Sequence, residues 1–194
     1  MLFRSRLDKD TSGLLVVARN LISHKRLVEQ LAERAILREY DAIVVGVMTG
    51  GGTVDQPIGR HPVDRKRMAV TERGRPAVTH YRVVERYRGH TRVKARLETG
   101  RTHQIRVHMA YLHYPLLGDP TYGGRLRIPA GSGDRLKQAL HDFRRQALHA
   151  ARLGLEHPES GEYLEWEAPL PQDMAHLIEI LREDARTAEA ETPT

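Results

Sequence analysis

Hydrophobic and polar residues alternate in a way that predicts a strand, a helix and a second strand in the first quarter of the chain. Leu14 to Ala18 is a short continuous apolar run, which is typical of a buried strand. Between Ser23 and Ala35 the apolar residues recur at helical spacing, and Ser23 is a candidate N-cap. Arg38 to Met48 is rich in β-branched residues and is followed by Thr-Gly-Gly-Gly, so we expect a strand that ends in a flexible turn.

The middle of the chain predicts a β-hairpin followed by a helix. Ala77 to Tyr87 and Thr91 to Glu98 have strand character and are separated by a short turn that contains glycine. Thr102 is a candidate cap for a helix that runs to about Leu112 and has one apolar stripe. Arg106 lies off that stripe, so its side chain need not point into the core.

The last part of the chain predicts a helix, two strands and a final helix. A polar loop precedes a helix near Asp134 to Arg145, and strands follow near Leu148 to Leu155 and Glu162 to Trp166. Pro171 suits the first turn of the last helix, which carries its apolar residues on one face. We expect the polar residues 185–194 to form a disordered tail.

Strands and helices mix without regular β-α-β units, so we expect an α+β fold with a mixed, mostly antiparallel sheet flanked by helices. A chain of 194 residues suits one domain, which we place at residues 1–184. The absence of cysteine excludes disulfides and thiolate metal sites. No apolar run approaches the roughly 20 residues that cross a bilayer. We therefore expect a monomeric cytoplasmic protein that is not bound to membranes.

Basic residues are concentrated in the middle of the chain. The net charge is +6, yet the segment from Gln56 to Ala110 alone holds 14 Lys or Arg residues against 4 Asp or Glu residues. Clustered basic residues are typical of nucleic-acid binding, and arginine, which dominates here, suits phosphate and base recognition. A set of solvated strand faces is the alternative interpretation of the same charges.

Three segments carry candidate chemistry. Residues 6–15 read RLDKDTSGLL and place an aspartate on a Thr-Ser-Gly turn before an apolar run; residues 100–108 read GRTHQIRVH, and residues 115–123 read PLLGDPTYG. In this order they resemble the RluA/RluD family of pseudouridine synthases, which isomerise uridine in RNA. The resemblance runs from Arg6 to about Asp184. GGTVDQPI at 51–58 is one of the details that point to the branch acting on large-subunit ribosomal RNA.

The resemblance implies three catalytic residues. Asp8 matches the family's catalytic carboxylate, which acts either as a nucleophile or as a base, and Tyr40 matches the active-site tyrosine that stacks on a flipped base. Arg106 matches the arginine that pairs with this carboxylate. The residues alone leave other roles open: a local turn for Asp8, an ordinary strand tyrosine, and a phosphate contact for Arg106. We assign the neighbouring Asp10 to turn structure.

The resemblance also implies residues that bind substrate. Arg101 and His103 suit phosphate contacts. Leu116 and Leu117 resemble a loop that packs on the target base, although by composition they are equally a core edge. The next two residues of that loop, Asp119 and Pro120, are expected to fix its shape.

We expect neither a metal ion nor another cofactor. Isomerising uridine requires no redox chemistry, and His103, His108 and His113 recur every five residues, which does not bring their rings to one helix face. RNA is therefore the only partner that we expect.

The chain departs from the family in two respects. Ser5 stands where family members usually have histidine, and the chain begins only a few residues before the motif. We expect it to lack a strand of the catalytic core and a small S4-type RNA-binding module. A non-catalytic RNA-binding or ribosome-assembly module is therefore the alternative function. A nucleotide hydrolase or glycosylase is a third possibility, although the chain has no Gly-rich phosphate loop.

Overall fold

A computed structural model describes residues 7–190 of the chain. The main-sheet strands are β1 (Ser12–Gly13), β2 (Leu37–Val45), β3 (Gly52–Asp55), β6 (Val78–Arg86), β7 (His90–Leu97), β8 (Leu148–Glu156) and β9 (Tyr163–Glu167), and a separate pair is β4 (Ile58–Arg60) with β5 (Met68–Val70). The helices are α1 (Leu21–Ala32), α2 (Gln104–Tyr111), α3 (Asp134–Asp142) and α4 (Gln172–Ala190).

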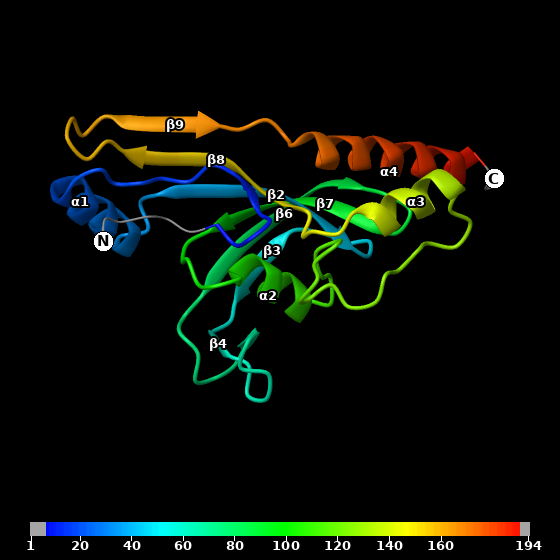
Figure 1. The fold of residues 1–194 in the computed structure, drawn as a ribbon, viewed down its shortest axis with the longest axis horizontal. Helices are drawn as coiled ribbons and strands as arrows, with labels where there is room; N and C mark the ends of the chain where they lie inside the picture. The colour runs from blue at the N-terminus through cyan, green and yellow to red at the C-terminus, as the bar shows by residue number, and fades with distance from the viewer. Residues whose placement is uncertain (1–6, 191–194) are drawn as a thin grey trace.

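The main sheet runs in the order β1-β8-β2-β7-β6-β3, and β9 also pairs with β8. Among the described strands only β1 and β8 pair in parallel, whereas all the other strand pairs are antiparallel. This confirms the expected α+β class. Figure 1 shows α2 beneath the sheet, α3 and α4 at one end and α1 at the other. The segment with β4 and β5, residues 57–75, projects from the body and is called the arm below.

Alternation along β2 and β7 explains the layers on the two faces of the sheet. Ala42, Val44, Val93 and Ala95 are buried and pack with the apolar side of α2. On the other face, Ile43 packs with a second cluster formed by α3 and α4. Each fully buried aliphatic side chain stabilises the fold by about 1.5–3 kcal/mol, so the two clusters fix α2 and α4 on opposite faces of the sheet.

Two expectations near the N-terminus are wrong in detail. The first strand is Ser12–Gly13, not the apolar run after it, and that run is not buried as a whole, because Leu15 is 43% and Val17 is 51% exposed. Helix α1 is capped by Asn20, whose side chain accepts a hydrogen bond from the Ser23 amide at 2.7 Å, and Ser23 is inside the helix. The first error arises because a run of apolar residues does not by itself indicate which of them face the core, and the second because Asn and Ser are both favoured N-caps.

The expected cap of α2 is also wrong. His103 occupies the N-cap position with a left-handed φ of 57°, and Thr102 is exposed. The Gln104 side chain stabilises the N-terminus of α2 instead. Its oxygen accepts a hydrogen bond from the Arg101 amide at 2.9 Å, and its nitrogen donates to the Val78 carbonyl at 2.9 Å. The first turn of α2 is therefore tied to β6.

The expected disordered tail is wrong for residues 185–190, which continue α4 as far as Ala190. The helix extends past Asp184 because Asp184 pairs with Arg88 at 2.9 Å and Ala185 packs against the cluster beneath α4. Residues 191–194 lie outside the described residues. The hairpin and the remaining predicted strands and helices are confirmed, with bounds that differ by a few residues.

Candidate active site

A cavity of about 330 Å³ lies between the turn around Asp8 and the start of α2. It contains four of the residues that we singled out: Asp8, Tyr40, Arg101 and His103. The apolar part of its wall is formed by Leu7, Leu14, Val16, Leu31, Leu97, Ile105, Leu148 and Leu153. Small-ligand sites have volumes of about 300 to 1,000 Å³ and combine apolar walls with convergent polar groups, and this cavity is lined by both kinds in about equal measure.

A tight turn holds Asp8 at the edge of this cavity. The Thr11 amide donates to the Asp8 carbonyl at 3.0 Å, and Asp10 adopts a left-handed φ of 68°. The turn is fastened to the body by Gln146, whose side-chain nitrogen donates to the Lys9 carbonyl at 2.6 Å and to Thr11 Oγ1 at 2.9 Å. The Asp8 side chain remains 20% exposed, so its carboxylate is fixed but accessible.

Arg106 lies directly behind Asp8, and its side chain is only 5% exposed. Its Nη1 is 3.4 Å from Asp8 Oδ2, whereas its Nε and Nη2 donate to the two carboxylate oxygens of Asp119 at 2.7 and 2.9 Å. Although burial alone would lower the pKa of Arg106, the hydrogen bonds to Asp119 raise it above its ordinary value. The guanidinium is therefore permanently charged, and its main partner is Asp119.

Asp119 organises the loop that follows α2. Besides holding Arg106, its Oδ1 accepts hydrogen bonds from the Thr121 amide at 2.8 Å and from the Tyr122 amide at 3.0 Å. Burial alone would raise the pKa of Asp119, but the bonds from Arg106 and these amides lower it. The carboxylate therefore stays ionised and shapes the loop, as the sequence predicted, and it also positions the arginine, a role that the sequence did not reveal.

Tyr40 reaches the cavity from β2. It packs against the apolar cluster shared by the sheet and α2, and it is half-buried. Burial raises the pKa of its hydroxyl; the positive charge of Arg38 opposes this shift and the negative charge of Asp8 adds to it. Tyr40 is therefore a neutral phenol beside the carboxylate, with a ring suited to stacking on a base.

His103 adjoins Asp8 at the start of α2. Its Nε2 is 4.0 Å from Asp8 Oδ1, and its Nδ1 lies 2.9 Å from the hydroxyl of Tyr122. The two rings meet edge to face, with centroids 5.6 Å apart and planes at 77°. The left-handed backbone of His103 thus turns its ring toward both Asp8 and the loop after α2.

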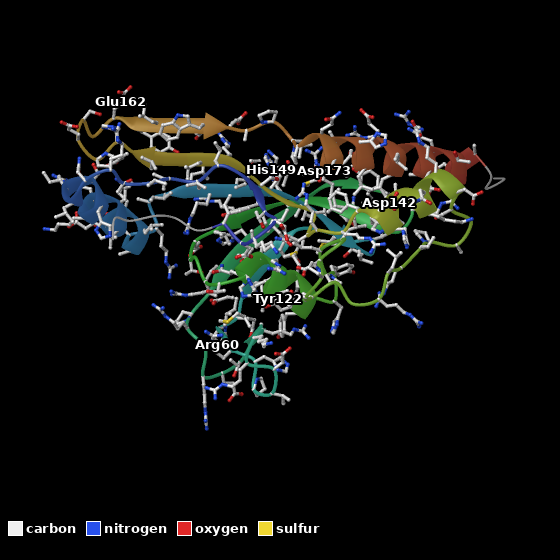
Figure 2. The ribbon with its side chains drawn as sticks, in the orientation of Figure 1. Arg60, Tyr122, Asp142, His149, Glu162 and Asp173 are labelled. Atoms are coloured by element: carbon white, nitrogen blue, oxygen red, sulfur yellow. The ribbon has the colours of Figure 1, made fainter. Side chains whose placement is uncertain are left out.

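Tyr122 is a residue that the sequence reasoning missed. The guanidinium groups of Arg67 and Arg106 both lie over its ring, with their central carbons 5.1 and 5.0 Å from the ring centroid. Its hydroxyl accepts a hydrogen bond from the Met68 amide at 3.0 Å. Figure 2 shows Tyr122 beside α2, above the arm that carries Arg60. Only its position three residues after Asp119 in the loop motif could have drawn attention to it.

Of the other predicted substrate-binding residues, Arg101 lies at the cavity, whereas Leu116 and Leu117 lie in the core. Arg101 lines the cavity, and its Nε donates to the Pro76 carbonyl at 2.9 Å. Leu116 and Leu117 are 0% and 1% exposed and pack in the two core clusters on opposite faces of the sheet. Neither leucine lines the cavity around Asp8, so the structure supports the core interpretation of this pair.

Within residues 7–190, no group of three or more His, Asp or Glu side chains could hold a metal ion. His108, for example, is buried and lies 2.9 Å from both Thr79 Oγ1 and the Gln56 carbonyl. In the same part of the chain, no helix is long and apolar enough to cross a membrane.

Comparisons with known proteins agree with this geometry. Residues 4–111 match the family model described as RNA pseudouridylate synthase. The chain is 58% identical over 179 residues to "Ribosomal large subunit pseudouridine synthase D" of Pseudomonas aeruginosa and 59% identical over 179 residues to the protein of that name from Escherichia coli K12. These matches cover 92% of the chain but only 56% and 55% of the two relatives, so the chain spans little more than half of their length.

Two solved human structures have a similar fold. "Human RNA Pseudouridylate Synthase Domain Containing 4" is 30% identical, with a TM-score of 0.72, over 93% of this chain and 76% of that one. "Human RNA Pseudouridylate Synthase Domain Containing 1" is 27% identical, with a TM-score of 0.69, over 94% of this chain and 80% of that one.

Proposed function

Because the chain belongs to the RNA pseudouridylate synthase family, we propose that it isomerises uridine to pseudouridine and that its substrate is large-subunit ribosomal RNA. The observation that carries this proposal is the arrangement around Asp8. An accessible carboxylate shares a cavity with Tyr40 and is backed by the buried charge of Arg106. The two relatives are named as ribosomal large subunit pseudouridine synthases, and these names support the choice of substrate.

The reaction rearranges one nucleotide. The bond between uracil N1 and the ribose C1′ breaks, the uracil turns, and a bond from C5 to C1′ forms. C5 loses a proton and N1 carries one in the product, so the composition of the nucleotide is unchanged. Asp8 serves this sequence either by attacking C1′ as a nucleophile or by removing a proton from the sugar. Arg106 holds the carboxylate in place for either role, because its Nη1 lies 3.4 Å from Asp8 Oδ2.

The target nucleotide must leave its stack to reach the cavity, which costs a few kcal/mol. Phosphate contacts from the basic arm would offset this cost. Arg65, Lys66 and Arg73 are exposed on the arm, and Figure 2 shows Arg60 on the same projection. Tyr40 provides an aromatic face on which the extruded base can stack.

The direct test is an assay of the product. Wild type and Asp8→Asn are incubated with transcribed large-subunit RNA, followed by pseudouridine-specific chemical labelling. We expect labelling with wild type and none with Asp8→Asn, which keeps the shape but removes the charge, whereas Asp10→Asn should retain activity. Free uracil would indicate a glycosylase, and bound but unchanged RNA would indicate a non-catalytic RNA-binding module; either result would refute the proposal.

From the proposed ribosomal RNA target we further propose that the protein acts in the cytoplasm, in ribosome biogenesis and as a monomer. The monomeric state is checked by light scattering of the purified chain with and without RNA. A dimer in the absence of RNA would contradict it.

A further inference from the structure

Arg38 is an unpaired cation in the wall of the cavity that contains Asp8. It lies on β2 two residues before Tyr40, so both side chains leave the same face of the sheet. Both line the cavity together with Asp8. A second cavity-lining arginine, Arg101, comes from the loop before α2.

Neither arginine has a carboxylate partner among the described residues. Arg38 Nη2 donates to the Glu98 carbonyl at 3.1 Å, and its buried Nε has no hydrogen-bond partner. Arg101 Nε donates to the Pro76 carbonyl, which is also neutral. Burial lowers the pKa of both guanidinium groups, because desolvation disfavours the charged form.

Neighbouring arginines, by contrast, have carboxylate partners. Arg34 is ion-paired with Glu98, and Arg106 with Asp119. Gly100 in turn leaves room for Arg38, since a Cβ atom on Gly100 would lie 2.7 Å from Arg38 Nη1. The fold thus places a desolvated, uncompensated guanidinium in the wall of the cavity that Asp8 also lines, an arrangement that favours an incoming anion.

We propose that Arg38, assisted by Arg101, binds a phosphate group of the target nucleotide and so places its ribose against Asp8. This proposal rests on the proposed function, because it assumes that a nucleotide enters the cavity. The planar guanidinium fork matches two phosphate oxygens, and the partners that it already has are neutral carbonyls. The two arginines thus provide the charge that orients the nucleotide, while Asp8 provides the reacting group.

The test compares ligands that differ only in a phosphate. Uridine, uridine 5′-monophosphate, uridine 3′-monophosphate and inorganic phosphate are titrated into wild type, Arg38→Gln and Arg96→Gln, with binding followed by NMR. Arg96 is the matched control, because it is an exposed arginine paired in register with Glu39 and therefore on the opposite face of the sheet from Tyr40.

In wild type and in Arg96→Gln, we expect at least one monophosphate to bind about ten-fold or more tightly than uridine, the size typical of a charge-assisted hydrogen bond. Arg38→Gln should abolish this preference, and Arg38→Lys should retain part of it. The same preference in Arg38→Gln and wild type would overturn the proposal, as would inorganic phosphate binding that is insensitive to Arg38. Dispersed amide spectra of each variant exclude loss of the fold.

This experiment is independent of turnover. If the monophosphate preference depends on Arg38 but no pseudouridine forms, the phosphate site stands and the proposed isomerase activity fails. If pseudouridine forms but the preference is absent or does not depend on Arg38, the isomerase activity stands and the phosphate site fails.

Discussion

Arg106 is held by Asp119 through two hydrogen bonds of 2.7 and 2.9 Å, and this pair is buried behind the turn that carries Asp8. Asp8 lies 3.4 Å from the remaining nitrogen of the same guanidinium. The arginine is thus positioned mainly by a residue that does not line the cavity. Arg106 therefore keeps two charge-assisted hydrogen bonds that do not depend on Asp8.

Asp119→Asn should therefore lower both stability and activity. Removing one partner of a buried pair costs about 3 to 5 kcal/mol, because the remaining charge is left uncompensated. The free energy of unfolding, measured by urea denaturation, provides the check. Glu183→Gln is the control: it breaks an exposed pair with Arg135 and should cost less than about 1 kcal/mol. Equal decreases in the two variants would show that Asp119 does not hold a buried charge.

The sequence identified much of the site but not its supports. Asp8, Tyr40 and His103 were singled out by motifs, and the structure brings them to one cavity. Asp119 as the partner of Arg106 and Tyr122 as the link to the arm were not foreseen. These interactions depend on how the loop after α2 folds back, and neither periodicity nor motif spacing specifies that path.

The fold was predictable wherever periodicity was strong. The hairpin of β6 and β7 and the antiparallel sheet were expected, because strand propensity and turn residues agree there. The extension of α4 beyond Asp184 was not, because its polar residues resemble a tail. Tertiary interactions decide that case: the ion pair of Asp184 with Arg88 and the packing of Ala185 hold a segment whose composition alone predicts disorder.

Tyr122→Phe should loosen the arm while keeping the core intact. The substitution removes the hydroxyl that accepts from the Met68 amide and contacts His103, but it keeps the ring that both Arg67 and Arg106 contact. Removing a hydrogen bond worth about 1 kcal/mol corresponds to roughly five-fold faster amide exchange at Met68. Hydrogen-exchange NMR measures this rate. Tyr163→Phe, which alters an exposed hydroxyl bound to Glu165, should leave it unchanged, and an unaltered rate in Tyr122→Phe would contradict the link.

His90 should make stability depend on pH below neutrality. It is 1% exposed, and burial lowers its pKa to about 4 although the charge of Asp184 acts in the opposite direction. Above the unfolded pKa of about 6.5, the ring is neutral in both states. As pH falls from there toward 4, only the unfolded chain gains the proton, so the free energy of unfolding should drop by roughly 3 kcal/mol.

The measurement for His90 is urea denaturation of wild type and His90→Gln at intervals between pH 6.5 and 4. We expect a shallower decline in the variant, because the group that protonates only on unfolding is gone. His176→Gln provides the comparison, since the His176 side chain is 62% exposed. Identical declines in wild type and His90→Gln would show that the imidazole is not kept neutral by the fold.

The arm should bind RNA phosphates, and the salt dependence of RNA binding should show how many. Arg65, Lys66 and Arg73 are exposed there, and none has an ion-pair partner in the described part of the chain. Changing all three to Gln should reduce the slope of log K against log salt by about 0.7–0.9 for each phosphate that the arm no longer neutralises.

The matched control for the arm changes Lys25, Arg135 and Lys137 to Gln, which removes the same net charge from residues that are already ion-paired on α1 and α3. Filter binding to a large-subunit RNA fragment at several salt concentrations gives both slopes. The arm variant should show the smaller slope, and the control should match wild type. Phosphate binding by the arm predicts a smaller slope only when the arm residues are changed. Equal slopes in the two triple variants would therefore mean that net charge alone attracts RNA.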